Sequence, residues 1–129
     1  MSLEVRTSDW FAQMYENLPD VDAHLVNAFW DHCEANGLNG WKGKVKESWK
    51  VPSDYPDREH RVAHSLANNL WHAHIGYPKW EPSKNEEATY LTSEYVIHFQ
   101  YVPGNDYIRF VHYGSHEKPF ELPTEKHME

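Results

Sequence analysis

The chain has 129 residues, of which 40% are hydrophobic, 25% charged and 15% aromatic, a balance typical of one globular domain. Its formal net charge of −8 argues against the basic footprint of a general nucleic-acid coat protein, and no run of about 20 apolar residues predicts a membrane span. One cysteine excludes an internal disulfide framework and fits a reducing compartment. Because no signal peptide is visible either, we expect a cytoplasmic protein.

The first 40 residues predict a short strand and two helices. Residues 3–7 alternate apolar and polar side chains, as a strand does. Ser8 or Asp9 is expected to cap a short helix, and Asp20 is expected to cap a second, longer one. The inward stripe of this second helix is predicted from apolar residues that recur every four positions: Val21, Leu25, Phe29 and Cys33.

The middle of the chain predicts a loop and a third helix. Residues 37–56 contain three glycines and two prolines, which favours a loop with one short strand near Val45. Asp57 is expected to cap a helix whose apolar stripe comprises Val62, Leu66 and Leu70. Residues 70–75 fit a helix and a strand equally well.

Two strands close the chain after a predicted loop over residues 76–89. They span residues 90–101 and 107–113, and Pro103-Gly104-Asn105-Asp106 joins them as a hairpin turn. Strict alternation places Phe110 and His112 on the same face of the second strand. We therefore expect an α+β fold, with the N-terminal strand and helices packed on an antiparallel meander. Residues 1–122 are expected to form one domain, and residues 123–129 a polar tail that frays.

The end of the last strand carries the most informative side chains. Gly114 permits a sharp turn that would present His116 at the rim of the sheet, on the same strand as Arg109 and His112. A cation and two imidazoles suit phosphate chemistry, because a cation stabilises a phosphoryl transition state and histidine moves protons near neutral pH. The alternative is that His116 simply caps the turn.

These residues form the pattern R-F-x-x-x-G-[ST]-H-x-x-x-F over residues 109–120, which resembles the C-terminal end of RelE-like toxins, especially the YafQ branch. Ala73-His74-Ile75 resembles the Ala-His-Val segment of that family, and Ser93-Glu94-Tyr95 resembles its Pro-Asp-Trp. Arg61-Val62-Ala63-His64 resembles a run in YafO-type members. The resemblance implies a RelE-like fold and the toxin of a toxin–antitoxin system. Such a toxin is an endoribonuclease that cleaves messenger RNA on the ribosome and is restrained by an antitoxin protein.

The resemblance also implies roles for single residues. His116 and His74 match two catalytic histidines, and Glu94 takes the place of a functional aspartate. Arg109 matches a strand arginine, whereas His112 stands where the family tends to carry arginine. The residues expected to bind RNA are aromatic or basic: Tyr95, Phe120, Trp80, Arg61 and Lys50.

The implied reaction needs no metal and no cofactor. A base removes the proton of a ribose 2′-OH, the oxygen attacks the adjacent phosphorus, and an acid protonates the departing 5′-oxygen. We expect His116 to be the acid, His74 or Glu94 the base, and Arg109 and His112 to surround the phosphate. An acidic chain gains little from phosphate neutralisation, so RNA binding would need the ribosome or a local basic patch. Residues 41–62, which carry a net charge of +2, offer such a patch.

Two other functions stay open at this point. Histidines at metal-ligand spacing could hold zinc in a hydrolase, and the candidate pairs are His60 with His64, His72 with His74, and His98 with His112. Alternatively, residues 1–40, with seven acidic residues and one basic residue, could form the face of a non-enzymatic module that binds or inhibits a basic protein. None of these readings calls for a membrane or for DNA as a partner.

Overall fold

The computed structural model describes residues 2–83, 90–116 and 121–129. The fold is α+β, as expected from the sequence. In chain order the elements are β1 (Glu4–Thr7), α1 (Asp9–Glu16), α2 (Asp20–Asn36), β2 (Val45–Glu47), α3 (Arg58–Ala67), β3 (Leu70–His74), β4 (Glu81–Pro82), β5 (Leu91–Thr92), β6 (Tyr95–Gln100), β7 (Tyr107–Ser115) and α4 (Glu125–Met128).

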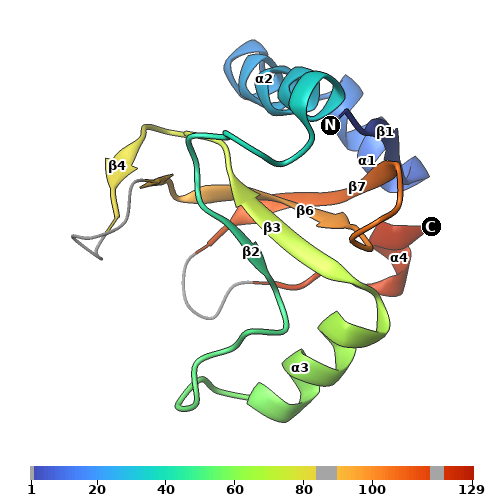
Figure 1. Ribbon diagram of the computed structural model, residues 1–129, viewed down its shortest axis with the longest axis vertical. Helices are drawn as coiled ribbons and strands as arrows, with labels where there is room; N and C mark the ends of the chain where they lie inside the picture. The colour runs from blue at the N-terminus through green and yellow to red at the C-terminus, as the bar shows by residue number, and fades with distance from the viewer. Residues whose placement is uncertain (1, 84–89, 117–120) are drawn as a thin grey trace.

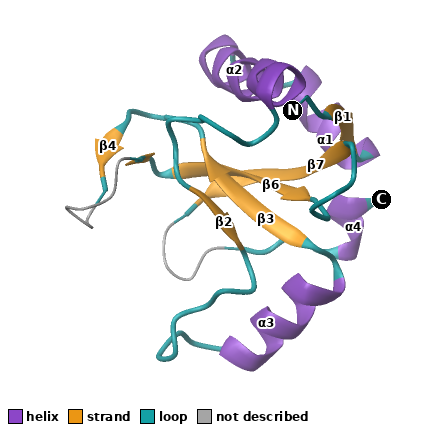
Figure 2. Cartoon of the chain, viewed as in Figure 1, coloured by secondary structure: helices purple, strands orange, loops and turns teal. Residues whose placement is uncertain are grey.

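A five-stranded sheet in the order β1-β7-β6-β3-β2 organises the domain. β1 runs parallel to β7, whereas the other neighbouring strands are antiparallel. The short strands β4 and β5 pair separately beside it. Helices α1 and α2 lie on one side of the sheet, and α3 lies toward the other (Figures 1 and 2). We call the side under α1 and α2 the helix face and the opposite side the histidine face.

The hydrophobic core lies between the sheet and helices α1 and α2. Phe29 of α2 stacks on Phe110 of β7 with ring centroids 5.6 Å apart, and Phe11 of α1 meets the same ring edge-on at 5.6 Å. All three rings are fully buried. Aromatic pairs in these geometries contribute beyond the area that they bury, so this cluster fixes the two helices on the sheet.

Both N-terminal helices form where expected, but the inward face of α2 differs from the prediction. The Ser8 side chain accepts a hydrogen bond from Phe11 N–H and caps α1 as expected. In α2, Val21 is 63% exposed, whereas Asp22 and Val26 are buried. Asp22 is buried because its carboxylate accepts a 2.6 Å hydrogen bond from the Tyr113 hydroxyl. Phe29 and Cys33 are buried as predicted and Leu25 is half-buried against the core, so the prediction for the stripe is wrong only at Val21.

Two further expectations for helical segments are wrong. In α3, Leu66 is 52% exposed and Ser65 is buried, so the side of the helix that packs toward β3 is not the predicted apolar stripe. The tail after residue 122 does not fray, since it forms α4, which packs on α1 and β7. Within the described residues, no helix has the length and apolar run needed to cross a bilayer.

The strands show which of the predicted segments are extended, including residues 70–74, for which the sequence fitted a helix and a strand equally well. Residues 70–74 form β3, which pairs with both β2 and β6. The predicted hairpin between β6 and β7 is confirmed, and Gly104 supplies the positive φ of 99° that its turn requires. The predicted strand over residues 90–101 is interrupted at Ser93 and Glu94, so it forms β5 and β6 instead.

Candidate functional site

Histidine side chains line the face of the sheet that α1 and α2 leave uncovered. His72 of β3 pairs in register with His98 of β6, which in turn pairs with His112 of β7. His74 lies two residues beyond His72 and therefore points to the same side. The predicted sharing of a face by His72 and His74, and the cross-strand pairing of His98 and His112, are thus confirmed.

The imidazole rings form a continuous row, which we call the histidine row. Its ring centroids are separated by 4.9 Å from His74 to His116, by 5.0 Å from His116 to His72 and by 6.0 Å from His72 to His98. The row continues over 5.4 Å from His98 to His112 and over 4.2 Å from His112 to His127 of α4. Six histidines from four elements and one strand end therefore share one surface.

A β-bulge makes this row possible. The pairing register shifts between His98 and Phe99, so that Phe99 faces Phe110 while His98 faces His112. One extra residue in β7, Val111, separates the two partners. Phe110 therefore stays in the core while His112 turns to the histidine face. The sequence prediction that Phe110 and His112 share a face is wrong for this reason, because strict alternation cannot anticipate a bulge.

His74 is held by the break between β5 and β6. Its Nδ1 lies 3.0 Å from the N–H and 2.7 Å from the carbonyl oxygen of Ser93. The Ser93 hydroxyl donates to Tyr95 O at 3.0 Å and accepts from Gly76 N–H at 3.0 Å, which fixes this corner. Burial lowers the pKa of His74, so the ring is neutral near pH 7. Its Nε2 is the nitrogen left to face a substrate.

His116 leaves β7 where the strand ends and turns toward His74 and His72. Its backbone N–H donates to Glu94 O at 2.5 Å, which anchors the turn. Burial, together with nearby His74, Lys44 and Lys46, lowers the pKa of His116 to about 4. A neutral imidazole accepts protons, so at neutral pH this electrostatic environment suits a general base better than the general acid that we expected.

His72 sits between these two rings and the rest of the row. The Ser48 hydroxyl lies 2.8 Å from His72 Nδ1, and both residues are buried. Burial, followed by the neighbouring histidines, holds the pKa of His72 well below its ordinary range. Ser48 thus orients the neutral imidazole of His72, which lies between His74 and His116 on one side and His98 on the other.

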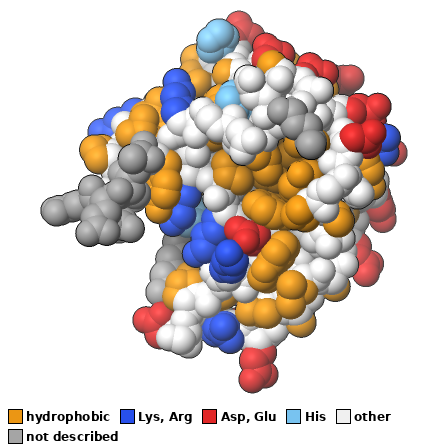
Figure 3. Space-filling model, in the orientation of Figure 1, with side chains coloured by type: hydrophobic (Ala, Val, Ile, Leu, Met, Phe, Trp, Pro, Cys, Tyr) orange, Lys and Arg blue, Asp and Glu red, His pale blue; other side chains and the backbone are white. Residues whose placement is uncertain are grey.

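Two lysines of the β2 edge complete the site. Lys44 precedes β2 and Lys46 lies within it, and both charges depress the pKa of His116. Lys46 is paired in register with His72, and burial lowers the pKa of its own ammonium. Figure 3 shows that Lys and Arg side chains gather over β2 and its flanks, while acidic side chains line the margin formed by the helices. Sequence reasoning noted this basic segment but assigned neither lysine to the site.

The structure brings some of the expected catalytic residues together and separates others. His74 and His116 meet, and Glu94, whose side chain is exposed, is joined to His116 through its backbone. Arg109 lies seven residues before His116 on an extended strand, a span of about 23 Å. It donates a 2.8 Å hydrogen bond to Gln100 Oε1 instead. The expected meeting of Arg109 with His116 around one phosphate is therefore wrong, and His112 is likewise four residues away.

The expected RNA-binding residues do not form one surface. Tyr95 packs between Tyr77 and Tyr113 on the helix face, away from His116. Lys50 pairs with Glu47 at 2.7 Å, and Arg61 lies over the Tyr55 ring on α3, at the opposite end of β3 from β4 (Figure 1). Phe120 lies outside the described residues.

Trp80 is the exception, because it lies next to the end of β3 that carries His74. Its indole packs so closely over Gly43 and Gly76 that a Cβ at either glycine would come within 2.7 Å of it. Lys42 Nζ lies 5.3 Å from the Trp80 ring centroid. A half-buried indole beside a cation is suited to stacking on a base.

The residues whose positions suit metal binding are not the histidine pairs predicted from the sequence. The rings of His60 and His64 stack at 6.1 Å, but His64 Nε2 is engaged 2.5 Å from Pro123 O. Among residues that the structure describes, the one group of three whose ligand atoms converge is His112, Glu121 and His127. The cluster of His72, His74 and His116 is not among such groups.

Comparison of the chain with protein-family models, curated proteins and solved structures finds no match.

Proposed function

We propose that the protein is a RelE-like endoribonuclease toxin that cleaves messenger RNA, in association with the ribosome, by attack of the ribose 2′-OH on the adjacent phosphate. The observation that carries the proposal is the convergence of His74, His116 and His72 beside Lys44 and Lys46 on the histidine face, where His116 is partly exposed. The α+β order of strand, helices and antiparallel meander is consistent with the fold that the motif resemblance implies. A cognate antitoxin is the expected partner.

The neutral imidazole of His116 is the base in this mechanism. It takes the proton of the 2′-OH as the 2′-oxygen forms a bond to phosphorus. The bond from phosphorus to the 5′-oxygen breaks, and the Lys46 ammonium supplies the proton to that oxygen. The products are a 2′,3′-cyclic phosphate and a 5′-OH. This assignment exchanges the acid role that the sequence suggested for His116, because its lowered pKa leaves it unprotonated at neutral pH.

The remaining side chains bind and orient. Lys44 and Lys46 provide the positive charge that the phosphate needs, and so compensate locally for the net charge of −8. His74, fixed through Ser93, keeps the His116 ring in place, and Trp80 offers a stacking surface at the same end of β3.

The test is induced expression in a bacterial host with mapping of RNA ends. The wild type is expected to arrest growth and to create new 5′-hydroxyl ends in translated messages. His116→Gln should reduce cleavage by about 10²–10⁴-fold. His60→Gln, which changes an exposed histidine, is the matched control and should cleave like the wild type. Intact messages with a folded wild-type protein would reject the ribonuclease.

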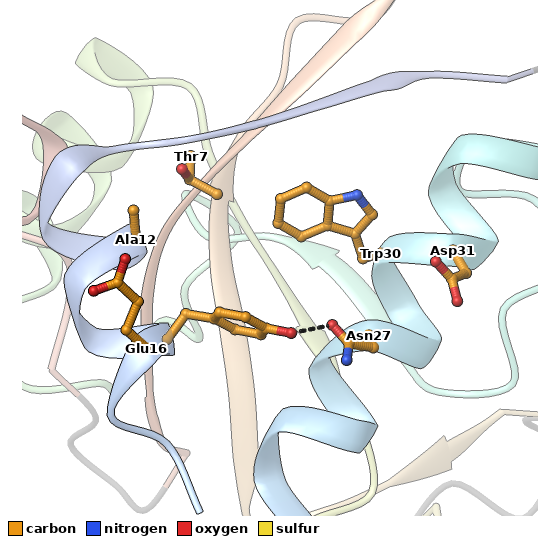
Figure 4. Close-up of a pocket in the computed structure, with 7 residues that line it drawn as sticks. Thr7, Ala12, Glu16, Asn27, Trp30 and Asp31 are labelled. Atoms are coloured by element: carbon orange, nitrogen blue, oxygen red, sulfur yellow. Dashed lines mark hydrogen bonds between the residues drawn. The ribbon is translucent and has the colours of Figure 1, made fainter. Parts of the chain in front are cut away.

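A groove between α1 and α2 favours a second candidate, binding of a basic partner protein. It has a volume of about 480 Å³ and is lined by Thr7, Ala12, Tyr15, Glu16, Asn27, Trp30 and Asp31. Figure 4 shows Glu16 and Asp31 on the two helices that border it, with Trp30 between them. Exposed carboxylates around an indole suit a basic amphipathic segment. A synthetic helix rich in Lys and Trp should bind, and Glu16→Gln combined with Asp31→Asn should weaken that binding, whereas Glu34→Gln should not.

A further inference from the structure

The far end of the histidine row holds a second group of side chains that the proposed ribonuclease reaction does not use. Helix α4 places His127 against His112, and Glu121 precedes that helix. Each of the three residues offers a ligand atom, and these atoms all lie within 4.8 Å of one another. Two imidazoles and a carboxylate are the donor set that zinc and similar divalent metals prefer.

His112 lacks a partner that its burial would normally require. The side chain is 8% exposed, and within the described part of the chain its Nδ1 has no hydrogen-bond partner. Leaving a buried polar atom without a partner is costly, so such atoms in folded proteins are usually satisfied by a protein group, a water or an ion. The His112 ring lies in a cluster with His127 and Glu121, whose side chains are also metal ligands. A bound cation would therefore be a suitable partner for the His112 imidazole.

His127 is oriented as a ligand by the cap of its own helix. Its Nδ1 lies 3.0 Å from Thr124 N and 3.1 Å from Thr124 Oγ1. Nε2 is therefore the nitrogen available for a metal. In the structure Nδ1 accepts a hydrogen bond from the Thr124 N–H, so coordination at Nε2 would move the ring proton to Nδ1 and replace that bond by donation to Thr124 Oγ1, 3.1 Å away.

An aromatic wall closes the cluster on the side of α1. The Trp10 ring stacks 5.2 Å from His112 and meets His127 edge-on at 4.4 Å. It shields both imidazoles from water and holds the two elements that carry them together. Glu121 is exposed and completes the donor set from the solvent side.

We propose that His112, Glu121 and His127 form a zinc site that fastens α4 to β7, with water as the fourth ligand. Tetrahedral zinc places its ligand atoms about 3.4 Å apart, so ligand atoms that lie up to 4.8 Å apart need to approach by as much as about 1.4 Å when the metal binds. The site lies four residues along β7 from His116, about 13 Å on an extended strand, and is independent of the proposed RNA cleavage.

The experiment is titration of the full-length, metal-stripped protein with zinc chloride by calorimetry, with elemental analysis after dialysis. One zinc ion per chain and a higher melting temperature in its presence are expected. Glu121→Gln should weaken the zinc affinity at least tenfold without unfolding the protein, because the side chain is exposed. Glu125→Gln, an exposed glutamate on α4 itself, is the matched control and should bind zinc like the wild type.

A second pair of variants separates this site from other histidines. His127→Gln should lose the zinc and the thermal shift, whereas His60→Gln should keep both. Cobalt(II) bound in place of zinc should give the intense visible absorption of a tetrahedral site in the wild type and not in Glu121→Gln. Absence of zinc binding, or zinc that is lost in His74→Gln and retained in Glu121→Gln, would overturn the proposal.

Discussion

The two faces of the sheet are built from the same strands but carry different side chains: aromatic rings on the helix face and imidazoles on the histidine face. On the helix face, Phe99 and Phe110 pack against Phe29 of α2 in the hydrophobic core. On the histidine face, the residues that alternate with them are imidazoles, several of them as deeply buried as the core. Burial of the aromatic rings on the helix face stabilises the fold, whereas burial of the imidazoles on the histidine face lowers their pKa values and keeps them neutral. Alternation along a strand thus allows a fold to separate its stability from its chemistry.

The largest expected effect is on the helix face. Phe110→Ala removes the ring that contacts Phe29, Phe11 and Trp30, and should lower the free energy of unfolding by about 3–5 kcal/mol. Urea denaturation measures it, and Val21→Ala, at a position 63% exposed, is the control expected to change stability by less than about 0.5 kcal/mol. A loss at Phe110 no larger than the control would contradict the position of the core.

The buried histidines of the histidine face should make the free energy of unfolding depend on pH. The folded-state pKa of His116 is lowered from 6.5 to about 4, so the unfolded chain binds the proton more tightly. Stability is therefore full above about pH 7 and falls as the pH drops toward 4, by at most about 3 kcal/mol from His116 alone. Denaturation with a chelator present, repeated across that pH range, measures the slope.

The matched variant for this pH experiment is His116→Gln, which should reduce the slope by the share of one histidine. His24→Gln on the surface of α2 should leave the slope unchanged. The slope that remains in His116→Gln comes from the other histidines whose pKa burial lowers: His72, His74, His98 and His112. A stability that is constant between about pH 5 and pH 8 would mean that the row is not buried in solution.

A buried polar contact on the helix face gives a smaller effect. Tyr113→Phe removes the hydroxyl that donates to Asp22, a carboxylate that is only 6% exposed, and should cost about 1–3 kcal/mol. Burial, together with the same contact, raises the pKa of Tyr113, so ultraviolet titration of the wild type should show one tyrosine that ionises later than the others. Tyr95→Phe, in the neighbouring ring, is the control and should be close to neutral.

The smallest effect compares one hydrogen bond on the histidine face with an exposed serine. Ser48→Ala removes the hydroxyl that lies 2.8 Å from His72 Nδ1 and should cost about 1 kcal/mol. Ser53→Ala, at an exposed position, should change nothing measurable. If Ser48 orients the row as proposed, RNA cleavage should fall in Ser48→Ala while the fold stays intact. Unchanged cleavage would make the Ser48 contact purely structural.

Local patterns in the sequence determined the α+β class, the cap at Ser8, the hairpin before β7 and the sharing of a strand face by His72 and His74. These features follow from a few neighbouring residues, since capping, turn chemistry and strand alternation act over short range. The resemblance to the RelE-like family, in residues 73–75 and 109–120, also singled out His74 and His116, which the fold brings together.

Tertiary structure alone decided the composition of the two clusters. Lys46 joins His116 because β2 pairs with β3, His112 leaves the core because a bulge inserts Val111, and His127 reaches His112 because the last residues form a helix. Each contact joins segments that are distant in sequence or depends on a one-residue shift in register. Sequence periodicity predicts neither contacts between distant segments nor shifts in register. It indicates which side chains share a face of one element but not which elements become neighbours.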